Sequence, residues 1–354
     1  MPSLGKIALL CLALVTGPAL ADPPAALLTG HDGQHDFDFN VGTWHTHIRY
    51  LRHPLSKQES WTSFDGTVVV RKLWGGQAQY EEIEADGPVG HFEGMTLFLY
   101  DKQAQQWAQY FSNSNDGQMG APEIGAFKDG RGDFYSQDTV DGKTILVRMV
   151  WGDITPTSHH VEQSFSADGG KTWEANFIGD LTATTETPKV PTAFADPAQH
   201  DFDWQLGTWN IHMQRLLHPL SSAETWTTYD GSVDVKKLWG GRADLAEIDT
   251  QGPSGHLQFL SLRLYNPQSH QWTLNFAHAG SYLVGTPPMY GQFHDGKGTF
   301  YAQDTLDGKV ILESFSFGNI TGGKAQDQQA FSADGGKTWE VNWINDQTRT
   351  GPAQ

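Results

Sequence analysis

The chain contains one stretch twice, and this repeat limits what it can fold into. The first copy reads HDFDFNVGTWHTH from His35 to His47, and the second reads HDFDWQLGTWNIH from His200 to His212. Trp44 and Trp209 are 165 residues apart, and from Gly125 and Gly291 onward the offset is 166. A repeat of this length has the size of a whole domain, not of a solenoid unit. We therefore expect two duplicated domains.

The ends of the repeat suggest the domain boundaries. Residues 1–21 combine Lys6, an apolar run from Ile7 to Val15 and the small-x-small sequence Ala19-Leu20-Ala21, which is typical of a secretion signal. We expect domains at 34–182 and 200–348, joined by a linker at 183–199 that is rich in Thr, Pro and Ala. Since Cys11 lies inside the signal, the exported chain would contain no cysteine, as suits a periplasmic or secreted protein without disulfides.

Charge and hydropathy exclude two kinds of partner. The formal net charge of −18 repels nucleic acid and anionic lipid surfaces, so we expect no nucleic-acid partner. The apolar run of the signal is shorter than the ~20 residues that a spanning helix needs, and no later stretch is longer, so we expect no membrane span. We expect the partner to be a small-molecule ligand or substrate. We also expect the two domains to contact each other within the chain.

Both copies are rich in short β-branched and aromatic runs that end at Asp-Gly, Gly-Gly or Gly-Pro, a pattern typical of strands. About ten strands are expected in the first copy, at Thr43–Leu51, Trp61–Phe64, Thr67–Leu73, Ala78–Glu84, His91–Tyr100, Gln106–Ser112, Ala126–Phe127, Asp133–Gln137, Thr144–Trp151, His160–Ser166 and Thr172–Ile178. No stretch of the sequence has apolar residues at helical spacing, apart from a possible turn at Gln34–Asn40. The pattern predicts an all-β chain folded as sandwiches or as closed barrels, which leave no exposed edges.

Several polar residues recur on one face of the strand after Gly42. Trp44 and the residues in phase with it form one face, and the other face carries His47, Arg49 and His53. His212 and His218 take the same places in the second copy. An imidazole in a Trp-lined cavity would stay neutral and act as a base or a hydrogen-bond partner. The alternative is that these histidines only make structural hydrogen bonds. At His53, the alternative is that His53-Pro54 simply ends the strand.

Repeated carboxylates are the other candidates for chemistry. Glu82 and Glu247 form one equivalent pair, and Asp138 and Asp304 form another. A carboxyl group among tryptophans would have a raised pKa and could act as an acid or base. The alternative is that these carboxylates are solvated on the surface, as most acidic residues of so acidic a chain are.

The chain has 13 tryptophans, most of them repeated in register. Such residues form hydrophobic cores, but they also suit flat or sugar-like ligands. As ligand-binding candidates we take Trp44, Trp61, Trp74, Trp107, Trp209, Trp226, Trp239 and Trp272.

The segments Ser166–Trp173 and Ser332–Trp339 resemble the Asp-box hairpin of sialidases. In that hairpin a short Asp side chain caps its own turn and glycines supply positive φ. In propellers the box recurs once per blade, whereas here it occurs once per domain. We therefore expect a structural hairpin and no glycoside hydrolysis. Serine-nucleophile, P-loop and dinucleotide motifs are absent from the sequence.

An early Gly-x-Trp followed by about ten antiparallel strands resembles the calycin superfamily, which includes lipocalins and the haem-binding nitrobindins. The fuller string of HDFDF, GTW, HPLS, LWGG and DGGKTWE resembles a bacterial family of calycin-like proteins of unknown function, present here as two tandem copies. The resemblance implies two tandem calycin-like antiparallel β-barrels, each with a ligand cavity, and it transfers no catalytic residue. It places no haem-ligating histidine, so the cofactor stays unknown, and no metal site is predicted.

Three function classes follow. The first is a secreted or periplasmic binding protein that holds a small, partly apolar or aromatic ligand among tryptophans. The second is an acid–base enzyme (a lyase, isomerase or hydrolase) that uses a histidine and a carboxylate inside a barrel. The third is an interaction protein whose barrels pack on a partner. Differences between the copies, such as Arg49 against Gln214, would favour an enzyme with one degenerate domain.

Overall fold

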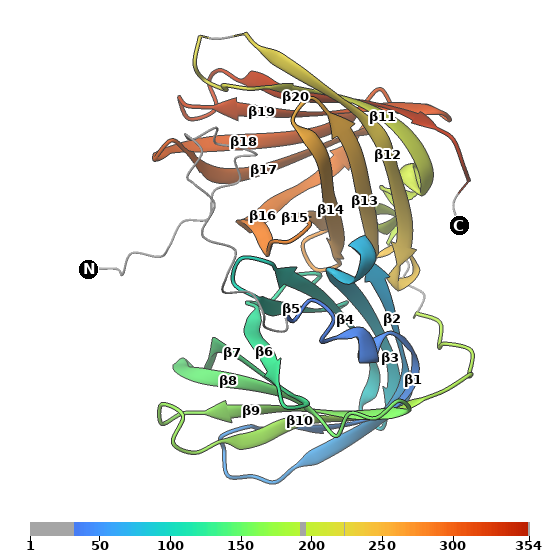
Figure 1. Cartoon of the computed structure of the whole chain (residues 1–354), viewed down its shortest axis with the longest axis vertical. Coiled ribbons are helices and arrows are strands. Elements are labelled where there is room, and N and C mark those ends of the chain that lie inside the picture. Colours follow the sequence, from blue (N-terminus) through green and yellow to red (C-terminus); the bar gives the residue numbers. More distant parts are fainter. Residues whose placement is uncertain (1–31, 192–195, 223, 353–354) are drawn as a thin grey trace.

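The computed structural model describes residues 32–191, 196–222 and 224–352, and these form two closed antiparallel β-barrels (Figure 1). The predicted all-β class and the two barrels are confirmed. The predicted signal at 1–21 lies outside the described residues, as does part of the predicted linker. Within the described residues, no helix has the length and apolarity to span a bilayer.

Barrel 1 contains ten strands, each paired with the next along the chain, and β1 closes the ring against β10. The strands are β1 (Gly42–Leu51), β2 (Trp61–Leu73), β3 (Ala78–Gly87), β4 (Gly90–Asp101), β5 (Gln106–Asn113), β6 (Glu123–Lys128), β7 (Arg131–Val140), β8 (Lys143–Gly152), β9 (Ser158–Ser166) and β10 (Glu174–Ala183).

Barrel 2 repeats this order and closes through β11 and β20. Its strands are β11 (Gly207–Leu216), β12 (Trp226–Leu238), β13 (Ala243–Gly252), β14 (Gly255–Asn266), β15 (Gln271–His278), β16 (Leu283–His294), β17 (Lys297–Leu306), β18 (Lys309–Gly318), β19 (Lys324–Ser332) and β20 (Glu340–Arg349). Short 3₁₀ turns precede the first strand of each barrel, at Asp38–Asn40 (η1) and Asp203–Gln205 (η4).

Two strands expected between Trp61 and Leu73 are one continuous strand, β2. Gly66 lies opposite Ala85, and a Cβ at this position would come within 2.0 Å of the carbonyl oxygen of Glu84. The glycine therefore allows β3 to approach β2 closely and does not mark a turn.

The repeated HDF sequence closes one end of each barrel. Phe37 is fully buried, and its ring packs against Phe98, Trp107, Phe127 and Trp151 at centroid distances of 4.8 to 5.2 Å. Phe202 takes the same place in barrel 2. Edge-to-face contacts of this kind suit aromatic cores. The first part of the repeat thus supplies a central aromatic residue to the core of each barrel.

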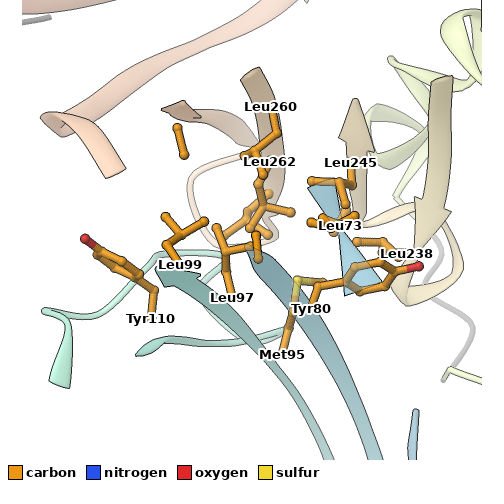
Figure 2. Close-up of a cluster of buried hydrophobic side chains, with 14 of the residues drawn as sticks. Leu73, Tyr80, Met95, Leu97, Leu99, Tyr110, Leu238, Leu245, Leu260 and Leu262 are labelled. Carbon is orange, nitrogen blue, oxygen red and sulfur yellow. The ribbon is translucent and has the colours of Figure 1, made fainter. Parts of the chain in front are cut away.

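The two barrels pack against each other through the outer faces of β2–β5 and β12–β15 (Figure 1). Buried side chains from both barrels form one apolar cluster, which we call the inter-barrel cluster: Leu73, Ala78, Tyr80, Met95, Leu97, Leu99, Ala108, Tyr110, Leu238, Trp239, Ala243, Leu245, Leu260, Leu262, Leu264 and Ala277. Figure 2 shows the leucines of the two barrels facing each other. The predicted contact between the domains is confirmed.

A buried ion pair lies in the same interface. Nη2 of Arg242 donates to both carboxylate oxygens of Glu93 at 2.5 Å, and Oγ of Ser114 donates to Glu93 at 2.6 Å. The side chains of Arg242 and Glu93 are only 5% and 4% exposed. A charge pair this deep is sensitive to the loss of either partner.

Each Asp-box hairpin is held by its aspartate. Oδ1 of Asp168 accepts from the amides of Lys171 and Thr172 at 3.0 and 2.9 Å, and Oδ2 accepts from the hydroxyl of Thr172. Asp334 makes the same bonds in barrel 2. These contacts are turn bonds, in agreement with the structural role that the motif predicts.

Asp168→Ala is expected to lower the melting temperature of barrel 1 while leaving ligand binding unchanged. The hydrogen bonds from Thr172 lower the pKa of Asp168 to about 2. Its stabilising effect should therefore be complete above the unfolded pKa of ~3.9 and fade as the pH falls toward 2. Thermal melts of parent and variant at pH 7 and pH 2 test this. A difference in melting temperature as large at pH 2 as at pH 7 would contradict it.

Candidate functional site

Barrel 1 encloses a cavity of about 380 Å³. Most of its wall is apolar, with Ile48, Ile83, Phe111, Met149 and Trp151 among the lining residues. The volume lies within the range of ~300–1,000 Å³ that is usual for small-molecule sites. A few polar groups interrupt the apolar wall, which is the usual composition of such a site.

Glu81 is the most deeply buried carboxyl group on this wall. The side chain points inward from β3, its residue is 5% exposed, and Oε1 accepts a hydrogen bond from Oγ1 of Thr96 at 2.8 Å. Burial raises the pKa of Glu81 to about 7, although the hydrogen bond from Thr96 and the nearby side chain of Asn40 lower it. The carboxyl group therefore changes its charge near neutral pH.

Glu123 is a second inward-facing carboxyl group, on β6, and it is 8% exposed. Burial raises its pKa to about 7, and the negative charge of Asp138 adds to the effect. Gln109 lies opposite it on β5, and its carbonyl oxygen accepts from Nε1 of Trp151 at 2.9 Å. The amide nitrogen of Gln109 is buried without a hydrogen-bond partner among the described residues. This part of the wall therefore offers a carboxyl group and an unused donor.

Barrel 2 encloses a much smaller cavity of about 90 Å³. The places of Glu81 and Glu123 are taken by Ala246 and Met289, and Phe98 is replaced by Arg263. Nη1 of Arg263 lies 3.1 Å from Oδ1 of Asp244, with both side chains 3% exposed. The interior of barrel 2 is therefore partly filled by its own charged side chains.

A second buried carboxyl group completes this cluster. Asp327 lies near Arg263, accepts from Nδ2 of Asn345 at 3.0 Å and accepts from Gln347. Burial raises the pKa of Asp244 and of Asp327 to about 7, and the positive charge of Arg263 lowers both. The guanidinium group also stacks 4.5 Å from the ring centroid of Phe202. Arg263 thus supplies the cation for two buried acids.

The predicted histidines lie outside the barrels. Trp44 and Ile48 point inward, so His47 points outward, where Nδ1 lies 2.8 Å from Oδ1 of Asp65 and the side chain is 43% exposed. His212 makes the same contact with Asp230 at 2.8 Å. The expectation that His47 points into a Trp-lined cavity is wrong, because the strand alternates and the tryptophan takes the inner face.

The other polar candidates of this stretch are also external. Arg49 is exposed on the outer face of β1, and the side chains of His53 and His218 are exposed in the turns after β1 and β11. The carbonyl groups of His53 and His218 accept from the hydroxyls of Ser56 and Ser221. The alternative reading, a turn that ends the strand, matches these contacts.

The predicted carboxylates divide between different places. Glu82 points out of barrel 1, and Oε1 accepts from the amide of Trp239 in barrel 2 at 3.4 Å. Glu247 lies 2.9 Å from Nζ of Lys236. Asp138 lines the cavity of barrel 1 near Glu123, as an exposed residue. Asp304 is buried, and its Oδ1 accepts from the amide of Thr305. Of the predicted set, only Asp138 joins a cavity wall in the described part of the chain.

The predicted tryptophans are mainly structural. Four of them are buried in the barrel cores and donate Nε1 to backbone carbonyls at 2.6 to 3.0 Å, namely Trp44, Trp107, Trp209 and Trp272. Trp74 and Trp239 pack in the inter-barrel cluster, and Trp61 and Trp226 are 40% and 38% exposed. None of the eight is among the described residues that line the two cavities. The tryptophans on those walls are Trp151 and Trp343.

A separate group of ligand-type side chains lies beside the interface. Atoms of Glu84, His91 and Glu93 fall within 4.8 Å of one another, and Nε2 of His91 lies 2.9 Å from Oε2 of Glu84. Burial raises the pKa of Glu84 to about 7, and Glu93 adds to the effect. Since Arg242 already binds both oxygens of Glu93, we interpret this group as part of the ion-pair network.

No protein-family model matches the chain, and no curated protein matches its sequence. Among solved structures, an S-type phycobiliprotein lyase from Guillardia theta matches 44% of this chain and 98% of its own, with 8% identity and a TM-score of 0.30.

Two further solved structures match most of the chain. A DUF3598-family protein of unknown function from Nostoc punctiforme matches 91% of this chain and 100% of its own, at 11% identity and a TM-score of 0.27. Transferrin-binding protein B from Haemophilus parasuis matches 88% of this chain and 76% of its own, at 8% identity and a TM-score of 0.20. TM-scores this low carry over neither a ligand nor an activity.

Proposed function

We propose that the protein is a binding protein that holds one small, largely apolar or aromatic molecule inside barrel 1. The observation that carries this proposal is the cavity of about 380 Å³ in barrel 1, against about 90 Å³ at the same place in barrel 2. Barrel 2 then serves as a packing partner, through the inter-barrel cluster. Export through the signal predicted at residues 1–21 and a calycin-like origin of the barrels are part of this proposal.

The composition of the wall supports an apolar ligand with a few polar groups. Burial of apolar surface contributes ~25 cal/mol per Å², so an aromatic body enclosed by Trp151, Phe111 and Met149 would supply most of the affinity. The unpartnered amide nitrogen of Gln109 and the buried carboxyl groups would fix its orientation.

Filling the cavity tests the proposal. N-phenyl-1-naphthylamine, an uncharged probe at neutral pH, is expected to bind the parent protein with increased fluorescence. Ile83→Trp places an indole in the cavity and should weaken binding at least tenfold. The matched control is Ile248→Trp, since Ile248 is the equivalent lining residue of barrel 2, and it should leave the affinity unchanged. Equal weakening by both variants, or no binding by the parent, would contradict the proposal.

An acid–base enzyme is the second candidate, and a specific observation favours it. Glu81 and Glu123 each have a pKa raised to about 7, where a carboxyl group can donate and accept protons at neutral pH. The chemistry would then belong to these two residues, since His47 faces outward. Turnover of a bound molecule that is lost in Glu81→Gln or Glu123→Gln, with binding retained, would identify an enzyme.

A further inference from the structure

We infer that the molecule bound in barrel 1 is an organic cation, namely an apolar or aromatic body that carries a protonated amine, which pairs with the carboxyl groups of Glu81 and Glu123. This inference rests on the proposed function and names the class of ligand.

The charge of the cavity wall comes from a small set of side chains. The ionisable side chains among the described residues that line it are Glu81, Glu123, Asp138 and Tyr50. No described lysine, arginine or histidine lines this cavity. His159 packs against Trp44 in the barrel core, at 4.5 Å between ring centroids, and burial lowers its pKa to about 4, so it carries no positive charge at neutral pH. The wall is thus acidic and has no cation of its own.

Ionising these buried carboxyl groups costs free energy. An ionised carboxylate is expensive to bury unless it is paired and hydrogen-bonded. Glu81 has a hydroxyl donor in Thr96 but no ion pair within the described part of the chain, and Glu123 faces the further negative charge of Asp138. A ligand that brings a positive charge would remove this cost for whichever carboxylate it meets. An anionic ligand would find no positive partner on the wall.

Barrel 2 differs from barrel 1 in the charges of its interior. There the buried acids Asp244 and Asp327 have a cation, Arg263, which occupies the place of Phe98. Glu81 and Glu123 are absent from that barrel, where Ala246 and Met289 stand instead. Barrel 2 thus contains both halves of its buried charge pairs and little space, whereas barrel 1 contains the acids and the space. A cationic ligand would supply the positive charge that the acids of barrel 1 do not find on the described cavity wall.

The charges also predict the direction of a pH effect. Because Glu81 and Glu123 have pKa values near 7, they are largely protonated at pH 5.5 and ionised at pH 8. The groups that face them are Thr96 and Asn40 at Glu81, and Gln109, Ser136 and Asp138 at Glu123. A protonated amine should therefore bind more tightly at pH 8 than at pH 5.5, whereas an uncharged analogue should not respond.

Three probes with one aromatic body separate the possibilities: 1-(aminomethyl)naphthalene, 1-naphthalenemethanol and 1-naphthoic acid. At pH 8 the amine should bind the parent at least about tenfold more tightly than the alcohol does. This difference corresponds to one strong charge-assisted contact. The carboxylic acid should bind more weakly than the alcohol. Glu81→Gln and Glu123→Gln should each reduce the preference for the amine, and the double variant should abolish it.

The control variant is Glu162→Gln, which removes the same charge from the outer face of β9 and should leave the preference intact. If amine and alcohol bind equally, and both are displaced by Ile83→Trp, the proposed function stands and the cationic class is overturned. If the acid binds best, the class is likewise overturned. If no probe is displaced by Ile83→Trp, the proposed function itself fails. A tenfold preference that the double variant abolishes supports both.

Discussion

Arg263→Phe is expected to destabilise barrel 2 by about 3–5 kcal/mol, the usual cost of removing one partner from a buried ion pair. The variant installs the residue that barrel 1 has at this place, Phe98. Asp244 and Asp327 would then be buried without a cation, as Arg263 lies 3.1 Å from Asp244 and lowers the pKa of both acids. Urea unfolding followed by tryptophan fluorescence measures the loss.

The pH dependence of this loss has a definite sign. Without Arg263, the pKa values of Asp244 and Asp327 would rise above about 7, so the folded state would hold both acids protonated at pH 5. At pH 8 the folded state must either ionise them in the interior or keep protons that the unfolded chain releases. The destabilisation should therefore be larger at pH 8 than at pH 5.

A matched variant separates charge from shape. Arg263→Phe combined with Asp244→Gln and Asp327→Asn removes the whole charge cluster, and Gln is the residue that barrel 1 has at the place of Asp244. The asparagine keeps a carbonyl oxygen for the amides of Asn345 and Gln347. Most of the lost stability should return. A triple variant as unstable as Arg263→Phe would show that packing on Phe202, and not charge, is what Arg263 provides.

Arg242→Gln is expected to cost about 3–5 kcal/mol, because Glu93 would remain buried in the interface without its cation. Glu84 lies in the same group, so the interface would hold two acids with His91 as the neighbouring base. The loss should appear as a lower urea midpoint, fitted with separate transitions for the two barrels since two domains need not unfold together.

The chain itself offers the control for this variant. The places equivalent to Arg242 and Glu93 in the other barrel are occupied by Gln77 and Gln258. The double variant Arg242→Gln with Glu93→Gln therefore replaces both charges by amides that the fold already carries, and it should be close to the parent in stability. A single variant as stable as the parent would contradict the account of the interface.

The repeat and the strands were predictable from the sequence because their signals are local. Turn residues such as Asp141-Gly142 bound the strands, and the strand pattern predicted the all-β class. The Asp box could be assigned a structural role, since its aspartate bonds only within its own turn. Closure of each sheet into a barrel was one of two alternatives, because pairing of β1 with β10 is a long-range contact.

The site was less predictable, because inside and outside could not be assigned from alternation alone. In β2–β5 the outer face is also buried, against barrel 2. Tyr80 and Leu97 therefore have the sequence pattern of a barrel interior although they belong to the inter-barrel cluster. On β1 the tryptophan defined the inner face, and Thr46 and Ile48 follow it there. His47 had to lie outside for the same reason.

Glu81 and Glu123 were missed because residues common to both copies were taken as the candidates. The residues that the two copies share lie mainly in turns and in the aromatic core, such as Phe37 and Trp107, and both barrels need them to fold. The cavity of barrel 1 depends instead on places where the copies differ, since Ala246 and Met289 replace the two glutamates. A search for charged residues at unequal positions on inner faces would have found them.

The most direct test of the central claim, that barrel 1 holds the ligand, is to locate a bound molecule. A bromine-labelled 1-(aminomethyl)naphthalene, soaked into crystals of the full chain, reports its position through anomalous scattering. We expect one bromine site per chain inside barrel 1, on the side of the cavity lined by Glu81, Trp151 or Glu123. Bromine only in barrel 2, in the interface between the barrels or on the outer surface would contradict it.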